Sequence, residues 1–254
     1  PPGEVDRSPP GTLSGEAGVE WQAFWDDGTD SEPFVQFDGS DTFDFRPGRG
    51  FWLTSRQDWS VTSTVSTVSL EADTAAKIPL NDGWTIISNP FDQAVPWAAV
   101  EAANEGSLQG LLPFEGTFND TTMTFASAAT GQAYYFLNDN SDRDSLVVPY
   151  PGAPSGKGLS KTDDARSPLL ALSAIPNGSD GPASTVRLGR ADSDAEETAL
   201  VAPTGRFEPV SLRIERPEKE TSTRRRFLMQ SRRAVEGNGT TFSLRLTRQG
   251  DGPV

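Results

Sequence analysis

The chain has 254 residues, enough to bury a hydrophobic core, and its 14 Phe and 6 Trp provide large surfaces for burial. It contains no His and no Cys, which excludes an imidazole base, a thiolate nucleophile, a disulfide and a Cys/His zinc site within this chain. The net charge of −14, with 18 Arg but only 4 Lys, favours an acidic, halophilic surface that stays hydrated at high salt, and it disfavours nucleic acid as a partner.

Residues 1–18 are rich in Pro and Gly, and we expect them to form a loose leader. The chain begins at Pro1 rather than Met, which we interpret as the start of a mature region or of a piece of a larger protein. No segment approaches the ~18–20 uninterrupted apolar residues of a membrane-spanning helix, so we expect no membrane insertion.

The region 19–150 contains one pattern twice, at a spacing of 83 residues. In the segment 45–53, FRPGRGFWL, a Gly turn runs into an aromatic strand, and the segment 125–137, which ends in GQAYYFL, repeats this arrangement. A short aromatic strand precedes each copy and a β-rich stretch follows each copy: 21–25 and 112–118, then 59–70 and 146–148. Two copies at so long a period fit a duplicated β-unit better than a solenoid, which needs about three or more copies.

Between the two copies, residues 83–91 read GWTIISNPF, a β-branched strand that Asn89-Pro90 closes with a turn. Residues 95–104 come next. There Pro96 suits a first helical turn, an Ala/Glu run favours helix, and the sequence from Asn104 ends it. We therefore expect one short helix in an otherwise β-rich domain.

A Pro/Gly/Ser-rich run at 149–158 marks a boundary, and we assign residues 151–159 to a linker. The charge changes there from 23 acidic and 6 basic residues in 1–150 to 13 acidic and 16 basic residues in 151–254, as expected for two separate units. Residues 160–254 contain short segments with strand character: 169–174, 185–188, 210–215, 226–230 and 242–247. The predicted fold is therefore mostly β, with a duplicated β-unit that carries one short helix, followed by an antiparallel β-sandwich.

The segments 45–53 (FRPGRGFWL), 83–97 (GWTIISNPFDQAVPW) and 130–136 (TGQAYYF) resemble a repeated β-rich region of large secreted and surface proteins of Bacteroidetes-like bacteria, including halophilic ones. The sequence departs from the usual pattern at Thr85 and Ser88, where the family has Asn and Gly. Proteins of this kind carry a sorting tail for type IX secretion. The resemblance implies an exported, non-catalytic part of a larger protein, located outside the cell or on its surface.

Four tryptophans are candidates for a face that stacks on sugar rings, because aromatic side chains on a β-sheet bind the C–H faces of sugars: Trp21, Trp25, Trp52 and Trp59. The alternative is that they pack in the core, since large aromatic residues at regular positions on short strands are usually buried. The position of Trp52, directly after a Gly turn of the family pattern, favours the structural alternative.

The run NDNSDRD contains a candidate calcium site, in which Asp139, Asp142 and Asp144 offer oxygen ligands close together. It does not match the EF-hand loop, because Arg143 occupies the sixth position, where that loop has Gly. Runs of Asn and Asp also form ordinary turns, so the alternative is a turn without metal. No other cofactor is expected.

No catalytic motif is found, and the sequence therefore predicts a non-catalytic structural or interaction module whose partners are other domains of a larger protein. A carbohydrate-binding module of a secreted hydrolase is the alternative, with polysaccharide as the partner. A carboxylate-based hydrolase is the third hypothesis, because paired carboxylates can cleave glycosidic bonds without His or Cys.

Overall fold

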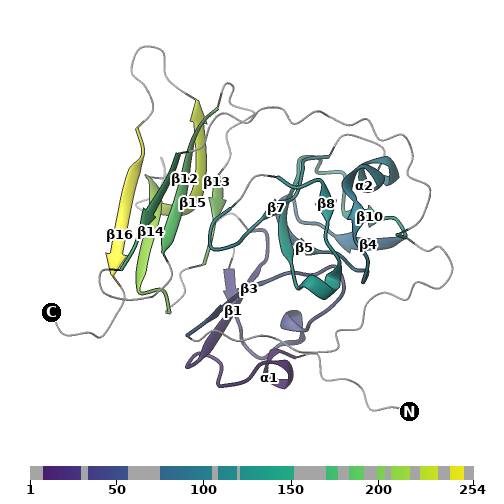
Figure 1. Ribbon diagram of the computed structural model, residues 1–254, viewed down its shortest axis with the longest axis horizontal. Helices are drawn as coiled ribbons and strands as arrows, with labels where there is room; N and C mark the ends of the chain where they lie inside the picture. Colours follow the sequence, from purple (N-terminus) through teal and green to yellow (C-terminus); the bar gives the residue numbers. More distant parts are fainter. Residues whose placement is uncertain are drawn as a thin grey trace. The chain divides into compact units, whose positions relative to one another are not determined.

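The computed structural model describes residues 8–29, 34–56, 75–104, 108–118, 121–151, 170–176, 183–191, 199–203, 207–217, 224–233 and 241–248. These residues form a mostly β fold, which confirms the predicted fold class (Figure 1). The chain divides into two compact units, Pro1–Phe114 with Asp120–Lys161, and Glu115–Asn119 with Thr162–Val254. Trp59, the predicted β-rich stretch 59–70, and the predicted linker apart from Pro151 lie outside the described residues.

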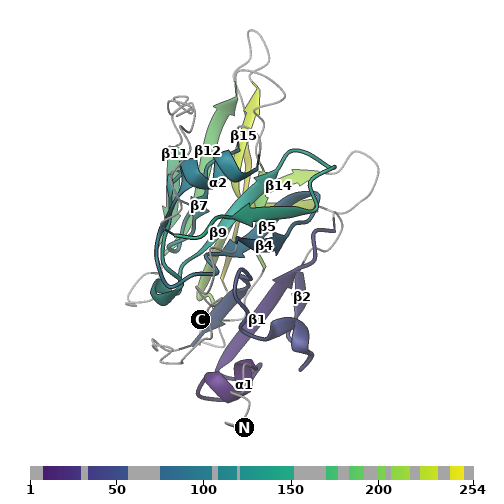
Figure 2. The same cartoon turned by 90° about the vertical axis from the view of Figure 1, so that its right-hand side faces the viewer.

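The N-terminal segment is not a loose leader over residues 8–18, and this part of the prediction is corrected. Ser8 caps a short helix, α1 (Pro9–Thr12), and Leu13 beyond it is only 6% exposed. The indole Nε1 of Trp21 donates a hydrogen bond of 3.2 Å to the carbonyl oxygen of Gly15. Figure 2 shows α1 beside the end of β1. Pro and Gly content alone led to the wrong prediction, because the apolar side chain of Leu13 completes a core that lies further along the chain.

The first sheet of unit 1 has the order β2-β1-β3, with β1 (Trp21–Asp26) between β2 (Phe34–Gln36) and β3 (Trp52–Ser55). Trp21 and Ala23 point to one face and pack with Leu13 and with Phe43, which belongs to the short helix η1 (Asp41–Phe43). Alternation along β1 places Phe24 and Asp26 on the opposite face. Both faces are covered, since Phe24 and Asp26 are also buried.

The rest of unit 1 forms a second lobe, which we define as residues 75–114 and 121–151. Its strands form three small groups: β5 (Gly83–Ser88) and β7 (Leu112–Pro113) on either side of β9 (Ala133–Asn138), β4 (Ala76–Pro79) with β10 (Ser145–Val148), and β6 (Val95–Pro96) with β8 (Thr124–Phe125). A second short helix, η3 (Ala128–Thr130), precedes β9.

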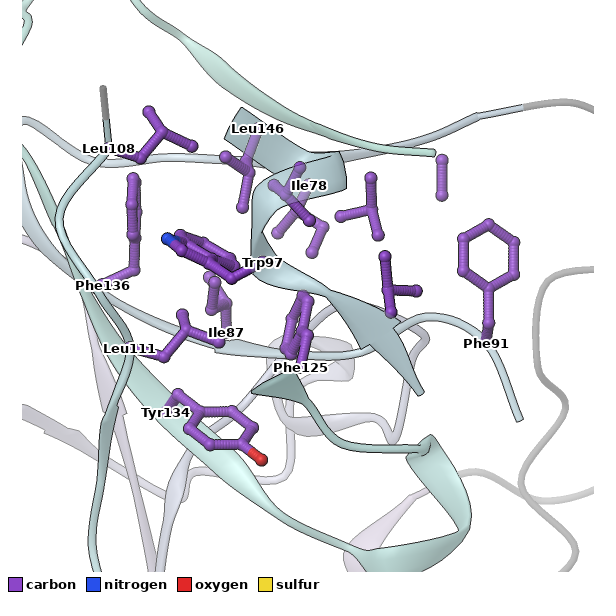
Figure 3. Packing of buried hydrophobic residues seen from close by; sticks show 14 residues of the cluster. Ile78, Ile87, Phe91, Trp97, Leu108, Leu111, Phe125, Tyr134, Phe136 and Leu146 are labelled. Carbon is purple, nitrogen blue, oxygen red and sulfur yellow. The ribbon is translucent and has the colours of Figure 1, made fainter. Parts of the chain in front are cut away.

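The core of the second lobe lies between these strands and α2 (Trp97–Ala103) (Figure 3). Tyr134 and Phe136 of β9 face this core, where Trp97 packs edge-on against Phe125 and Phe136 with ring centroids 6.1 and 5.8 Å apart. Because side chains alternate along a strand, Tyr135 points to the other face of the sheet. The central sheet of unit 1 is therefore buried on both faces.

Two local predictions for this lobe are confirmed. The side-chain oxygen of Asn89 accepts the Phe91 N–H at 2.9 Å. This bond forms the turn that was predicted at Asn89-Pro90, after the strand β5. The predicted helix is present and is followed by Asn104, whose amide donates to the Val100 carbonyl and also bonds the backbone of β10. Pro96 does not lie in its first turn as predicted, because it is extended and belongs to β6. Polar side chains thus satisfy the backbone groups that each irregular segment leaves unpaired.

Unit 2 is a sheet with the order β11-β12-β15-β14-β16, and β13 also pairs with β15. Its strands match the predicted ones except for the short β13: β11 (Leu170–Ala174), β12 (Ser184–Ala191), β13 (Ala199–Val201), β14 (Val210–Pro217), β15 (Arg224–Arg233) and β16 (Ser243–Arg248). The pair β12 and β15 is parallel, which departs from the all-antiparallel prediction. The Leu212 N–H donates to Ser184 Oγ at 2.9 Å, so β14 and β12 meet although they are not neighbours in the sheet, as in a sandwich.

Within the described ranges, no helix is long and apolar enough to cross a membrane. In unit 2, the buried strand β14 carries charged residues that form ion pairs. Arg213, only 4% exposed, binds both carboxylate oxygens of Glu208 at 3.0 and 2.8 Å, and Glu215 accepts from Arg245 at 3.2 Å. Both contacts to Glu208 come from Nη2 of Arg213, and charge-assisted hydrogen bonds of this kind are stronger than neutral ones.

Candidate functional site

Asp26, Trp52 and Tyr135 form a polar cluster between the first sheet and the second lobe, which we call the seam cluster, and Asp26 and Tyr135 are buried there. The Trp52 indole Nε1 donates to the Tyr135 hydroxyl at 2.8 Å, and that hydroxyl donates to Asp26 Oδ2 at 3.4 Å. The other oxygen of Asp26 accepts the Gly28 N–H at 3.0 Å. Asp26 is 6% exposed and Tyr135 is 3% exposed, so water reaches neither group freely.

Among the described residues, the carboxylate of the seam cluster has no counter-ion. No Lys or Arg in the described part of the chain forms an ion pair with Asp26. Burial raises the pKa of the Asp26 carboxyl above its ordinary value, although the hydrogen bonds from Gly28 and Tyr135 oppose this change. Burial, together with the nearby charge of Asp26, also raises the pKa of Tyr135 well above its ordinary value. Tyr135 therefore stays protonated and serves as a donor.

Two partly exposed aromatic rings, those of Phe114 and Trp84, contact the aromatic members of the seam cluster. The Trp52 ring meets Phe114 edge-on, with centroids 4.5 Å apart and planes at 71°, and Trp84 meets Tyr135 at 6.1 Å and 62°. A sugar-stacking platform needs rings that present their faces in one plane. These rings are tilted against one another instead, which is the arrangement of aromatic packing.

The structure describes three of the four tryptophans that the sequence grouped as a ligand-binding face, and it separates them. Trp21 is fully buried, so its assignment to an exposed sugar-stacking face is wrong. Trp25 is partly exposed, and the guanidinium of Arg49 lies over its ring at 4.7 Å from the centroid. Trp52 lies in the seam cluster, on the opposite face of the sheet, and Trp59 is outside the described residues. The described tryptophans do not share one face.

The predicted calcium loop is organised as a hydrogen-bonded turn. The side chain of Asn140 accepts the Asp142 N–H at 3.0 Å, and Arg143 lies 3.7 Å from the carboxylate of Asp139. Among the residues that the structure describes, no three acidic side chains lie close enough together to hold a metal ion, and this includes Asp139, Asp142 and Asp144.

Sequence reasoning missed Asp26 and Tyr135 as site residues. Asp26 was one of many carboxylates in an acidic chain, and Tyr135 was one of several aromatic residues in a strand. A usable signal was present, because Tyr135 holds the position in the segment 125–137 that Trp52 holds in the segment 45–53, at the spacing of 83 residues noted in the sequence.

No protein-family model matches the chain, and neither a curated protein nor a solved structure shows significant similarity to it.

Proposed function

We propose that the chain is a non-catalytic structural or interaction module of a secreted or cell-surface protein, and that its partners are other domains of that protein. The observation that carries the proposal is the use of the aromatic side chains within unit 1. The N–H of Trp52 is bonded to Tyr135, the N–H of Trp21 is bonded to the Gly15 carbonyl, and Trp97 is fully buried. Groups that would recognise a ligand are engaged in holding the domain together.

The location outside the cell rests on the resemblance of segments 45–53, 83–97 and 130–136 to exported surface proteins. The proposed halophilic character rests on the excess of 36 acidic over 22 basic residues and on the small number of Lys. A surface of this composition remains hydrated where salt screens its repulsion.

A carbohydrate-binding module is the second candidate. The partial exposure of Trp25, Trp52 and Trp84 favours it, since a sugar ring could reach one of these indoles. A carboxylate-based hydrolase has weaker support. Asp26 is the described carboxyl group whose pKa burial raises, and it is 6% exposed with a tyrosine rather than a second carboxyl group as its side-chain partner.

Tryptophan fluorescence, titrated with soluble polysaccharides at molar salt, separates the first two candidates. The structural proposal predicts no saturable change. A saturable shift that Trp25→Ala or Trp84→Ala abolishes would instead establish a carbohydrate site at that indole. Trp21→Phe is the matched control, because Trp21 is buried and its replacement removes fluorescence without altering an exposed ring.

A further inference from the structure

Strand pairing makes the two sequence copies equivalent residue by residue. In the first copy β1 and β3 are antiparallel, with Phe24 opposite Trp52. In the second copy β7 and β9 are antiparallel, with Leu112 opposite Tyr135. Trp52 therefore corresponds to Tyr135, and Phe24 corresponds to Leu112.

The Gly turns support the same equivalence. Gly48 and Gly131 lie four residues before Trp52 and Tyr135, and they have φ values of +85° and +68°. Both are therefore in the left-handed region, which residues other than glycine adopt at a cost. A difference remains beside the strands, since β5 pairs with β9 whereas β3 has only β1 as a neighbour among the described strands.

Counting two residues beyond Phe24 and Leu112 gives a further equivalent pair, Asp26 and Phe114. The contacts between the copies follow this equivalence reciprocally. Trp52 of the first copy contacts Phe114 of the second, and Tyr135 of the second copy contacts Asp26 of the first. When residue i contacts j and the equivalent of j contacts the equivalent of i, two units are related by a two-fold axis.

Residues on such an axis contact their own equivalents, and two pairs do so. Trp52 is bonded to Tyr135 at 2.8 Å. A Cβ atom placed on Gly50 would lie 3.0 Å from the Cβ of Ala133, which is 83 positions further along the chain. The same Cβ would also lie 2.5 Å from Cγ2 of Ile86, so a methyl group at position 50 would crowd two neighbours, and Ala133 is one of them.

We propose that unit 1 is a covalently linked dimer of one β-repeat, and that Asp26, Gly50 and Trp52 belong to a self-complementary docking face whose partner is a second copy of the same repeat. The contacts have specialised since the duplication. The pair of Trp52 with Phe114 is apolar, whereas the equivalent pair of Tyr135 with Asp26 is polar. In each pair the two residues therefore match in polarity: Trp52 with Phe114, and Tyr135 with Asp26.

This proposal deepens the interaction role proposed above and rests on it only in assigning the face to protein–protein contact. Its test measures stability, whereas the function is tested by ligand titration, so the failure of one is distinguishable from the failure of the other. Exchange of residues between the copies is the appropriate experiment, because a two-fold relation predicts which exchanges restore matched contacts.

Three variants of the full chain are compared by urea unfolding. The exchange Trp52→Tyr with Tyr135→Trp mismatches both reciprocal contacts, and so does Asp26→Phe with Phe114→Asp. All four substitutions together restore one apolar and one polar pair in swapped positions. We expect the fourfold variant to unfold at a higher urea concentration than either double variant. The proposal would be overturned if the fourfold variant lost as much stability as the two double variants lose together, or more.

The exchange of Gly50 and Ala133 provides a second cycle that does not disturb the polar cluster. Gly50→Ala alone brings a methyl group against both Ile86 and Ala133, and the double variant Gly50→Ala with Ala133→Gly removes the second of these contacts while the first remains in both variants. We expect the double variant to unfold at a higher urea concentration than Gly50→Ala. If the fourfold variant does not fold and the Gly50 and Ala133 changes prove additive, the two-fold relation is wrong.

Discussion

Trp52 donates its indole N–H to the hydroxyl of Tyr135, a residue 83 positions away in the chain, at 2.8 Å. This bond joins the first sheet of unit 1 to the second lobe, and Tyr135 passes it on by donating to Asp26 at 3.4 Å. The Tyr135 hydroxyl therefore accepts a hydrogen bond from β3 and donates one to β1, and both strands belong to the first sheet. Its removal would cost the Trp52 N–H and Oδ2 of Asp26 one hydrogen bond each, while Oδ1 of Asp26 would keep its bond from the Gly28 N–H.

Tyr135→Phe should lower the free energy of unfolding by about 1–3 kcal/mol, because the Trp52 N–H and Asp26 each lose a hydrogen-bond partner in a buried place. Urea unfolding monitored by tryptophan fluorescence measures this loss. Tyr150→Phe is the control, since the Tyr150 ring contacts Phe91 and lies outside the seam cluster, and it should change stability by less than about 0.5 kcal/mol. Equal losses in the two variants would contradict the role assigned to the Tyr135 hydroxyl.

Asp26→Asn should reveal how protonation of Asp26 affects stability. Burial raises the pKa of Asp26 in the folded state, so the folded chain holds this proton more tightly than the unfolded chain does. The contribution of the Asp26 proton to the free energy of unfolding is therefore fully present below the pKa of the unfolded chain, about 3.9. It is lost as the pH rises through the pKa of Asp26 in the folded chain. The stability of the wild type relative to Asp26→Asn should increase from pH 7 to pH 4.

Unfolding of both proteins across that pH range measures this difference, in which the titration of the other carboxyl groups cancels. A difference that stays constant, or that grows as the pH rises, would mean that the fold does not raise the pKa of Asp26.

Gly48→Ala and Gly131→Ala should each cost about 1–2 kcal/mol, because both glycines have positive φ values that a Cβ atom disfavours. Gly48→Ala should cost more. A Cβ on Gly48 would lie 3.0 Å from Cγ1 of Ile78, whereas no heavy atom lies within 4 Å of a Cβ on Gly131. Thermal unfolding of both variants measures the two costs. If Gly131→Ala were the more damaging change, steric contact at Ile78 would not be the reason for the difference.

Leu13→Ala should destabilise unit 1 by about 2–3 kcal/mol, since the side chain is 6% exposed and packs with Trp21 and Phe43. Leu170→Ala is a matched change at a position that is 59% exposed, and it should have an effect below about 0.5 kcal/mol. Chemical denaturation of the two variants compares them. A Leu13 variant as stable as the Leu170 variant would restore the loose-leader prediction.

The melting temperature of the whole chain should rise between low and molar NaCl. Residues 1–150 carry 23 acidic and 6 basic side chains, and their repulsion is screened only when the Debye length falls to about 3 Å near 1 M salt. Calorimetry at several salt concentrations measures the trend, with an uncharged osmolyte as the control. A melting temperature that does not respond to salt would argue against a halophilic surface.

Local sequence patterns were sufficient for most of the elements. Alternation of apolar and polar residues predicted β14 and β16, the β-branched run before Asn89-Pro90 predicted β5, and the Ala-rich stretch predicted α2. Each pattern acts within about ten residues, because backbone dihedrals, capping and alternation are set by near neighbours. Short strands such as β2, β4 and β13 were not predicted, since three or four residues are too few to establish a period.

The seam cluster depended on tertiary structure. Alternation states that Trp21 and Trp52 lie on opposite faces of their sheet, but it does not state what covers each face. Burial of Asp26 without a counter-ion follows from the packing of the second lobe over the end of β1, a contact made across more than a hundred residues. By itself the sequence determined the mostly β fold and the turns, because these depend on local chemistry. Only the tertiary structure decided which aromatic side chains are buried in the core and that the Asp26 carboxylate is buried, because burial depends on residues far apart in the chain.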